Sequence, residues 1–321
     1  MGKLFLLLIA LGGSSFLWGF FAHQRINRYA VFTLPPAMIG FYKKHIDYLA
    51  EASVAPDRRR YAVPSEAPKH YIDLDRYGEN ALATLPRTWQ QAMNTYGEDT
   101  LNARGVVPWH IKQMYDRLRD AFMMYDPEKI LRTSAELGHY VADAHVPLHT
   151  TSNYDGQLTG QQGLHAFWES RLPELFFEQY DLLVGKAAYI EDVQQAAWQA
   201  VAKAHAAADS VLLTDKKLAG RVGNKKYNFE TRGRQTVKVV AVDYATTYHQ
   251  LLQGMVERQL RASIKMVGDL WYSAWVDAGQ PDLKKLIGHN PTEEELKQRK
   301  ESWKNLNTGS HRIRPHEAEG N

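Results

Sequence analysis

A histidine and an aspartate four residues apart begin the stretch of sequence with the clearest capacity for chemistry. His139 and Asp143 would share one face of a helix, because residues at that spacing lie about one turn apart. His149 follows Pro147, where the helix must end, so its imidazole can turn back toward the same face. Imidazole and carboxylate groups gathered in this way can ligate a transition metal.

A second pair with the same spacing follows farther along the chain. His165 and Glu169 again place an imidazole and a carboxylate on one helical face. One such pair alone is usually a surface pair or a helix cap. Two pairs with a histidine between them are the kind of arrangement that builds a multi-metal site in an all-helical core. The sequence therefore predicts metal binding, with two unrelated surface pairs as the alternative.

Composition limits what could hold such a metal. The chain has 321 residues and no cysteine, which excludes a disulfide framework, a cysteine-ligated zinc finger and a catalytic thiol. Any transition metal must be held by His, Asp, Glu or backbone atoms. With 39 basic and 36 acidic residues the net charge is +3, too near balance to indicate a nucleic-acid coat protein.

Upstream segments offer four further candidates: Trp18, His23, Asp57 and His70. Each has a plain structural interpretation when taken alone. Asp57 could be a turn or cap residue, and His70 a loop histidine. His23 could simply stand near the start of a helix, and Trp18 at the end of an N-terminal signal region.

Together these residues resemble the superfamily that joins bacterial zinc-dependent phospholipases C with fungal single-strand-specific zinc nucleases. The family order is an N-terminal Trp, then His, Asp, His, His-x3-Asp, His and His-x3-Glu or Asp, and each position has a counterpart here. The resemblance covers roughly residues 18–178 and is closest to the bacterial phospholipase C-like members. It implies an all-α fold in a single multi-helix domain.

The resemblance also implies three zinc ions and their ligands. The first would be held by four side chains: Asp57, His70, His139 and Asp143. The second would be held by three: His149, His165 and Glu169. The third would be held by the free amine and carbonyl of Trp18 with two side chains, His23 and a bridging Asp143. Asp57 is in addition the candidate catalytic residue, able to take a proton from an attacking water.

The function implied is an exported zinc-dependent phosphodiesterase of phospholipase C type, in which metal-activated water attacks a phosphodiester. Three Zn²⁺ and three carboxylates leave about +3, which suits a phosphodiester anion and its transition state. The expected partner is a phospholipid headgroup, with peripheral membrane contact, and no protein partner is inferred. The alternatives are a nuclease for single-stranded nucleic acid and a non-catalytic zinc-binding envelope protein.

The N-terminus predicts export. Residues 1–17 resemble a signal peptide, with an apolar run over 4–11 and small residues over 12–15. A periplasmic or secreted location follows. The alternative is an uncleaved anchor, since residues 4–22 carry no charge. If cleavage leaves residues ahead of Trp18, its nitrogen is an amide, and two zinc ions are expected.

Helical periodicity dominates the remaining chain and strand signals are scarce, which predicts one all-helical zinc hydrolase domain over residues 18–280. Residues 281–321 are expected to form a charged, partly disordered tail with one solvated helix over 293–304. The helices are expected at these ranges: 25–33, 37–52, 85–96, 108–125, 127–145, 164–180, 190–213 and within 236–278. Residues 57–77 and 150–163 are expected to be loops.

Several other polar residues lie outside the implied ligand set. Asp73 and His145 are candidates to orient liganding imidazoles, with ordinary surface or helix-end positions as the alternative. Residues 216–238 contain eight basic residues against one acid, Glu230, and could contact a nucleic-acid backbone or an anionic lipid surface. A solvated loop is the plainer interpretation of that stretch. Four histidines without a carboxylate at ligand spacing are expected to be structural: His45, His110, His205 and His249.

Overall fold

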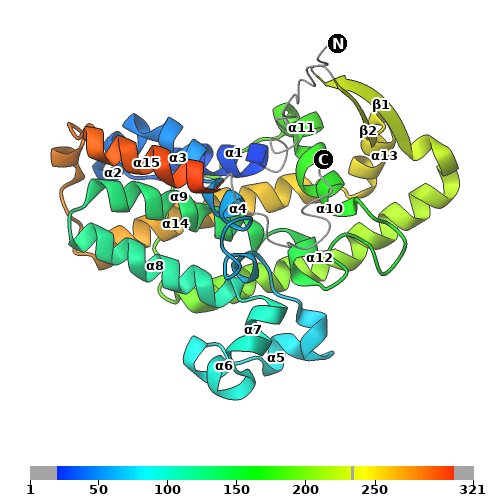
Figure 1. The fold of residues 1–321 in the computed structure, drawn as a ribbon, viewed down its shortest axis with the longest axis horizontal. Coiled ribbons are helices and arrows are strands. Elements are labelled where there is room, and N and C mark those ends of the chain that lie inside the picture. The colour runs from blue at the N-terminus through cyan, green and yellow to red at the C-terminus, as the bar shows by residue number, and fades with distance from the viewer. Residues whose placement is uncertain (1–19, 233–234, 307–321) are drawn as a thin grey trace, which may run out of the picture.

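The computed structural model describes residues 20–232 and 235–306 (Figure 1). Its α-helices are α1 Phe20–Ala30, α2 Pro36–Lys44, α3 Ile46–Ala52, α4 Ala55–Arg59, α5 Ala81–Thr84, α6 Trp89–Tyr96, α7 Glu98–Arg104, α8 Val107–Met123, α9 Pro127–Asp143, α10 Leu164–Ala166, α11 Leu172–Phe176, α12 Val193–Val222, α13 Val242–Leu251, α14 Met255–Asp277 and α15 Glu293–Leu306.

Short turns and one sheet complete the described chain. The 3-10 turns are η2 Val31–Thr33, η3 Ala67–His70, η4 Leu74–Tyr77, η5 Pro147–Thr150, η7 Phe177–Gln179, η8 Gly223–Lys226 and η9 Leu283–Leu286. A π-helical segment, η6, spans Phe167–Arg171. Strands β1 Tyr227–Arg232 and β2 Gln235–Val240 form a two-stranded antiparallel sheet. The fold is therefore mainly α.

Helix α9 lies at the centre of the core and contacts α1, α3, α8 and α14. Asp126 caps its start, since the side chain accepts a hydrogen bond from the Lys129 amide at 3.0 Å, and Pro127 occupies the first turn. Apolar periodicity buries α9 and α8 against their neighbours. On the far side of α8, Trp109 packs edge-on against Trp198 of α12, with ring centroids 5.0 Å apart.

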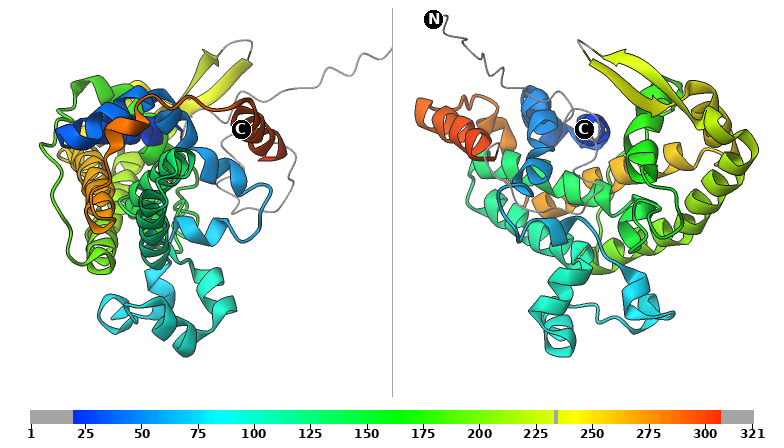
Figure 2. Two further views of the ribbon diagram at one scale, coloured as in Figure 1. Left: turned by 90° about the vertical axis from the view of Figure 1, so that its left-hand side faces the viewer. Right: turned by 45° about the vertical axis from the view of Figure 1, so that its right-hand side comes forward.

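Two parts of the chain project from this helical body. Helices α5, α6 and α7 form a small lobe at one edge, below the long helices in the view of Figure 1. The β1–β2 hairpin extends from another edge, beyond α12 and α13 (Figure 2). Between them, α9 contacts α1 and α4, and η6 contacts α1 and α10.

The hairpin corrects the expectation of a solvated loop over 216–238. Helix α12 continues to Val222, and the chain then forms β1 and β2. Phe229 pairs with Lys238, and Glu230 with Val237, so apolar and polar residues alternate across both strands. Residues 236–240 were expected to belong to a long helical pattern. They form a strand instead, because Val237, Val239 and Val240 are β-branched and fit a pleated surface.

Other expected boundaries also differ. Residues 57–77 contain α4 and two 3-10 turns rather than an open loop. The segment 164–180 is divided by η6, since Pro173 has no N–H to donate to the Glu169 carbonyl. The Leu172 amide bonds instead to the Phe167 carbonyl, which is the π-helical pattern.

The C-terminal helix α15 was expected to be solvated, but it is held against the body. The Arg299 guanidinium forms hydrogen bonds to both carboxylate oxygens of Glu128, at 2.7 Å each, and lies 3.8 Å from the Tyr48 ring centroid. At the other terminus, the expected signal peptide and Trp18 lie outside the described residues. Among the residues described, no helix is both long and apolar enough to cross a membrane.

Candidate metal centre

Helix α9 presents two of the predicted ligands at its C-terminal end. His139 and Asp143 are 0% and 1% exposed, and His139 Nε2 lies 3.1 Å from Asp143 Oδ2. The close approach of α1 to this end depends on Gly138. A Cβ there would meet Asn27 Oδ1 at 1.9 Å. Asn27 on α1 donates a hydrogen bond to the Ala135 carbonyl on α9 at 3.0 Å, and this bond holds the two helices close together beside the ligands.

The first cluster brings together the four side chains predicted for one ion. His70 Nδ1 lies 2.8 Å from Asp143 Oδ2 and 3.0 Å from His139 Nε2. Asp57 Oδ1 lies 3.7 Å from His139 Nε2 and 3.9 Å from His70 Nδ1. Two ligands of a tetrahedral zinc stand roughly 3.4 Å apart, given metal–ligand distances of about 2.1 Å. The observed separations bracket that value. His70, His139 and Asp143 are close enough to share one ion, and Asp57 forms an overlapping group with His23 and His139.

The second cluster contains three side chains from η5, α10 and η6. His149 Nε2 lies 3.2 Å from both His165 Nε2 and Glu169 Oε2. His165 Nε2 lies 2.8 Å from the same Glu169 oxygen. Three protein ligands leave a position open for water or substrate, as in catalytic zinc sites. These residues also form one of the described groups with donor atoms close enough to share an ion.

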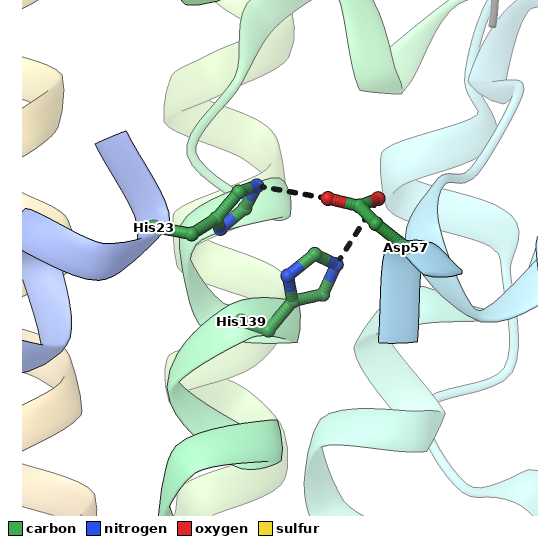
Figure 3. A group of neighbouring side chains, drawn as sticks. All are labelled: His23, Asp57 and His139. Atoms are coloured by element: carbon green, nitrogen blue, oxygen red, sulfur yellow. Dashed lines mark ion pairs between the residues drawn. The ribbon is translucent and has the colours of Figure 1, made fainter. Parts of the chain in front are cut away.

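His23 on α1 faces Asp57, which also approaches His139 (Figure 3). His23 Nε2 lies 3.5 Å from Asp143 Oδ1 and 4.0 Å from Asp57 Oδ2. Each carboxylate thus directs one oxygen to the first cluster and the other toward His23, as a bridging ligand would. Trp18, the remaining ligand implied for a third ion, lies outside the described residues.

Hydrogen bonds fix the orientation of two ligand rings. His149 Nδ1 donates to the His70 carbonyl at 2.6 Å, and His165 Nδ1 donates to the Tyr154 carbonyl at 3.1 Å. A ring that donates from Nδ1 keeps the Nε2 lone pair for a metal. The buried Asp155 carboxylate holds the chain between Tyr154 and His165 in place, because it accepts hydrogen bonds from the amides of Gly163 and His165.

Burial and neighbouring charges favour the metal-binding state of His70 and Asp143. Burial and the Arg60 guanidinium lower the pKa of His70 to about 4, so this imidazole is neutral at pH 7. Burial would raise the pKa of Asp143, but His139 and His149 outweigh it and hold that pKa well below its usual range. Neutral imidazoles and ionised carboxylates are the forms that ligate metals. For His149 the carboxylates of Asp143 and Glu169 outweigh burial and raise the pKa to about 9, so this imidazole must release a proton when a metal binds.

Two charged neighbours of the ligands were missed by the sequence analysis. The Arg60 guanidinium lies 3.1 Å from Asp57 Oδ1. Glu66 Oε1 lies 3.8 Å from His70 Nε2, the ring nitrogen that faces away from the first cluster. Glu66 precedes His70 by four residues, the spacing of the two pairs that were recognised. The four-residue spacing of Glu66 and His70 could have identified this contact. The segment was expected to be a loop, however, and residues four apart in a loop do not share a face.

The two residues suggested to orient ligands have different surroundings. His145 Nδ1 donates to the Val141 carbonyl at 2.8 Å, which is a helix-end contact. The His145 ring also lines a cavity of about 30 Å³ together with His23 and Glu169. Asp73 is buried, and its amide donates to the Arg104 carbonyl at 2.7 Å.

The histidines expected to be structural do have structural contacts. His205 Nδ1 lies 3.1 Å from Thr150 Oγ1, and His249 Nε2 lies 2.8 Å from the Tyr180 hydroxyl. The His110 ring meets Tyr140 edge-on, and the His45 ring packs at a tilt on Phe41. Among the described residues, His289 belongs to a further carboxylate group with Glu128 and Glu295. Arg299 already neutralises Glu128 in that group.

No family model matches the chain, and no match is found among the curated proteins. The argument for function therefore depends on the geometry. Five imidazoles and three carboxylates converge, and they come from segments between residues 23 and 169.

Proposed function

We propose that this chain is a zinc-dependent phosphodiester hydrolase of the phospholipase C type. One observation carries the proposal. The eight described side chains that the family resemblance implies as zinc ligands converge on one largely buried region, where they form three groups, two of which overlap at His139, with donor atoms close enough to share an ion. Unrelated surface pairs would have no reason to meet in this way. The donor set is nitrogen and oxygen, which zinc accepts.

The proposed ligand assignment is the one that the resemblance implies, and the measured distances are compatible with it. Asp57, His70, His139 and Asp143 would hold the first ion. His149, His165 and Glu169 would hold the second. His23 and Asp143 would contribute to a third. Bound zinc would supply Lewis acidity toward phosphoryl oxygens and would lower the pKa of a water at the centre.

The chain's own residues would position the substrate and manage protons. The ring orientations set by the His70 and Tyr154 carbonyls keep donor atoms aimed at the centre without rearrangement. Asp57 Oδ2, directed toward His23, is placed to accept a proton from an attacking water. His139 and Arg60 outweigh the burial of Asp57 and lower its pKa, so the carboxylate is ionised, which suits a metal ligand more than a strong base.

A paired activity assay on the purified full chain tests this function. Headgroup release from phosphatidylcholine and nucleotide release from single-stranded RNA would each be followed with and without a zinc chelator. We expect chelator-sensitive headgroup release. Nucleotide release alone would assign the chain to the nuclease alternative. If the zinc-bound protein releases neither headgroup nor nucleotide, the result would contradict the proposal and favour the non-catalytic alternative.

Replacement of His149 separates catalysis from a structural use of zinc. We expect His149→Ala to reduce turnover at least about a hundredfold, since the second site would lose one of three ligands. His249→Gln is the matched control, because His249 contacts Tyr180 and no described ligand. A variant that unfolds more readily yet turns over normally when folded would assign the ion a structural role.

A further inference from the structure

The β1–β2 hairpin exposes one face that the metal centre does not use. Alternate residues of a strand share a face, so Tyr227 and Phe229 lie on the same side as Lys238, the partner of Phe229. Phe229 is 68% exposed and Tyr227 is 39% exposed. Large aromatic side chains at that exposure on a projecting element indicate a contact surface. We call these three residues the hairpin face.

The other face of the hairpin is tied to the metal centre. The Glu230 carboxylate pairs with the Arg171 guanidinium, which is largely buried. Arg171 belongs to η6, the segment that carries Glu169 of the second cluster. Val237 and Val239 are partly buried on the same side. A surface that docks on the hairpin face is therefore held at a fixed position relative to the second cluster.

The charge around the hairpin face is positive. The cations that are exposed in and beside it are Lys216, Lys217, Arg221, Lys225 and Lys238. Two of the nearby acids are neutralised, since Asp215 is buried against the Lys226 ammonium at 2.8 Å and Glu230 is paired with Arg171. Asp243, just after β2, is exposed, so the exposed cations still outnumber the exposed acid. The surface complements an anionic partner.

The aromatic contacts favour lipid over nucleic acid. Single-stranded nucleic acid stacks its bases on open aromatic faces. The Tyr227 ring is instead engaged by two ammonium groups, with Lys238 Nζ 4.2 Å and Lys226 Nζ 5.6 Å from its centroid. Phe229 remains as one exposed apolar anchor among lysines, the combination by which proteins bind the surface of an anionic bilayer.

We propose that the hairpin face docks on an anionic phospholipid bilayer, with Phe229 entering the interfacial region and Lys225 and Lys238 contacting lipid phosphates. The docking is inferred from the exposed residues of the hairpin face alone. Its purpose, delivery of lipid phosphodiesters to the metal centre, rests on the proposed function. Because Arg171 links the hairpin to η6, docking would hold the second cluster at a fixed position relative to the headgroup layer.

Vesicle sedimentation tests the docking. The zinc-loaded full chain would be mixed with vesicles of equal parts phosphatidylserine and phosphatidylcholine. We expect Phe229→Ser to lower the partition coefficient about tenfold, since most of one buried Phe is lost. The double variant Lys225→Gln, Lys238→Gln should lower it by roughly the same factor. The matched controls are Phe32→Ser, where the ring is 51% exposed on η2, and the exposed pair Lys43→Gln, Lys186→Gln.

A soluble substrate separates docking from catalysis. Hydrolysis of a short-chain, water-soluble phosphatidylcholine should be unchanged in both hairpin variants. Vesicle binding equal to wild type in these variants would overturn the docking proposal. So would variants that lose binding to a fluorescent single-stranded oligonucleotide but keep vesicle binding. Hairpin-dependent vesicle binding in a chain that hydrolyses no soluble substrate would support the docking and overturn the proposed function.

Discussion

Glu66 faces the side of His70 that points away from the first cluster. Its carboxylate is 1% exposed and lies between Arg59 and Lys69, with ion-pair distances of 3.1 and 2.8 Å. The Tyr140 hydroxyl donates to the same carboxylate. A carboxylate behind a liganding imidazole orients the ring and raises its basicity. Glu66 Oε1 lies 3.8 Å from His70 Nε2, beyond hydrogen-bond distance, so we expect Glu66 to act on the ring through its charge.

We expect Glu66→Gln to weaken zinc binding about tenfold, because an amide orients and polarises His70 less than a carboxylate does. Competition with a chromophoric chelator measures the affinity. Glu136→Gln is the matched control, since Glu136 also pairs with Arg59, at 3.0 Å. Equal zinc affinity in the two variants would show that Glu66 acts only on stability.

At the scale of elements, local patterns predict the central helices well. The sequence places one helix over 108–125 and the structure over Val107–Met123, because apolar periodicity and proline at the start are both local signals. The helix that carries His139 ends at Asp143, two residues before the expected end. Both His–carboxylate pairs are predictable for the same reason.

The β-branched residues of β2 are a local strand signal that the sequence analysis missed, whereas the position of the hairpin depends on contacts distant in sequence. Glu230 pairs with Arg171, and the Ala241 amide bonds to the Lys226 carbonyl to close the hairpin base. The meeting of the two clusters is likewise tertiary. His70 reaches Asp143 only because 3-10 turn η3 packs beside α9. The four-residue spacing predicts the two His–carboxylate pairs. The packing of α1, α4 and η3 around α9 brings the other ligands next to them.

The packing of α1 on α9 provides a test at this scale. We expect Gly138→Ala to destabilise the fold by about 2 kcal/mol, because the added methyl would collide with the Asn27 side chain. Urea unfolding measures the change. Gly220→Ala on α12 is the matched control, since a Cβ there meets no atom within 4 Å. That change should stabilise by about 0.5 to 1 kcal/mol. Similar free energies for both variants would contradict the close-packing argument.

At the scale of the whole molecule, buried neutral histidines make stability depend on pH. Burial lowers the pKa of His110 to about 3, below the value near 6.5 expected when unfolded. Between these values the unfolded chain binds more protons, so stability is complete above pH 6.5 and falls as the pH decreases. This group alone should cost about 2 kcal/mol between pH 7.5 and pH 5.

The variant His110→Phe isolates that contribution. We expect its unfolding free energy to fall less steeply from pH 7.5 to pH 5 than that of the wild type, by the same amount. The histidines of the metal centre titrate equally in both proteins, so the difference reports His110. Parallel pH profiles would mean that the buried imidazole is not held neutral in the native state.

Removal of metal tests the whole fold, because the centre joins α1, α4, α9, η3, η5 and η6. A ligand that binds only the native state stabilises it by about 4 kcal/mol at a thousand times its Kd. For a chain of this size, that loss corresponds to a Tm lower by roughly 10 °C. We expect 1,10-phenanthroline to lower the Tm by this amount and added zinc to restore it. The isomer 1,7-phenanthroline, which cannot chelate, is the control. An unchanged Tm in a protein shown to be zinc-free would mean that the buried imidazoles and carboxylates satisfy one another without an ion, and the metal centre would be wrong.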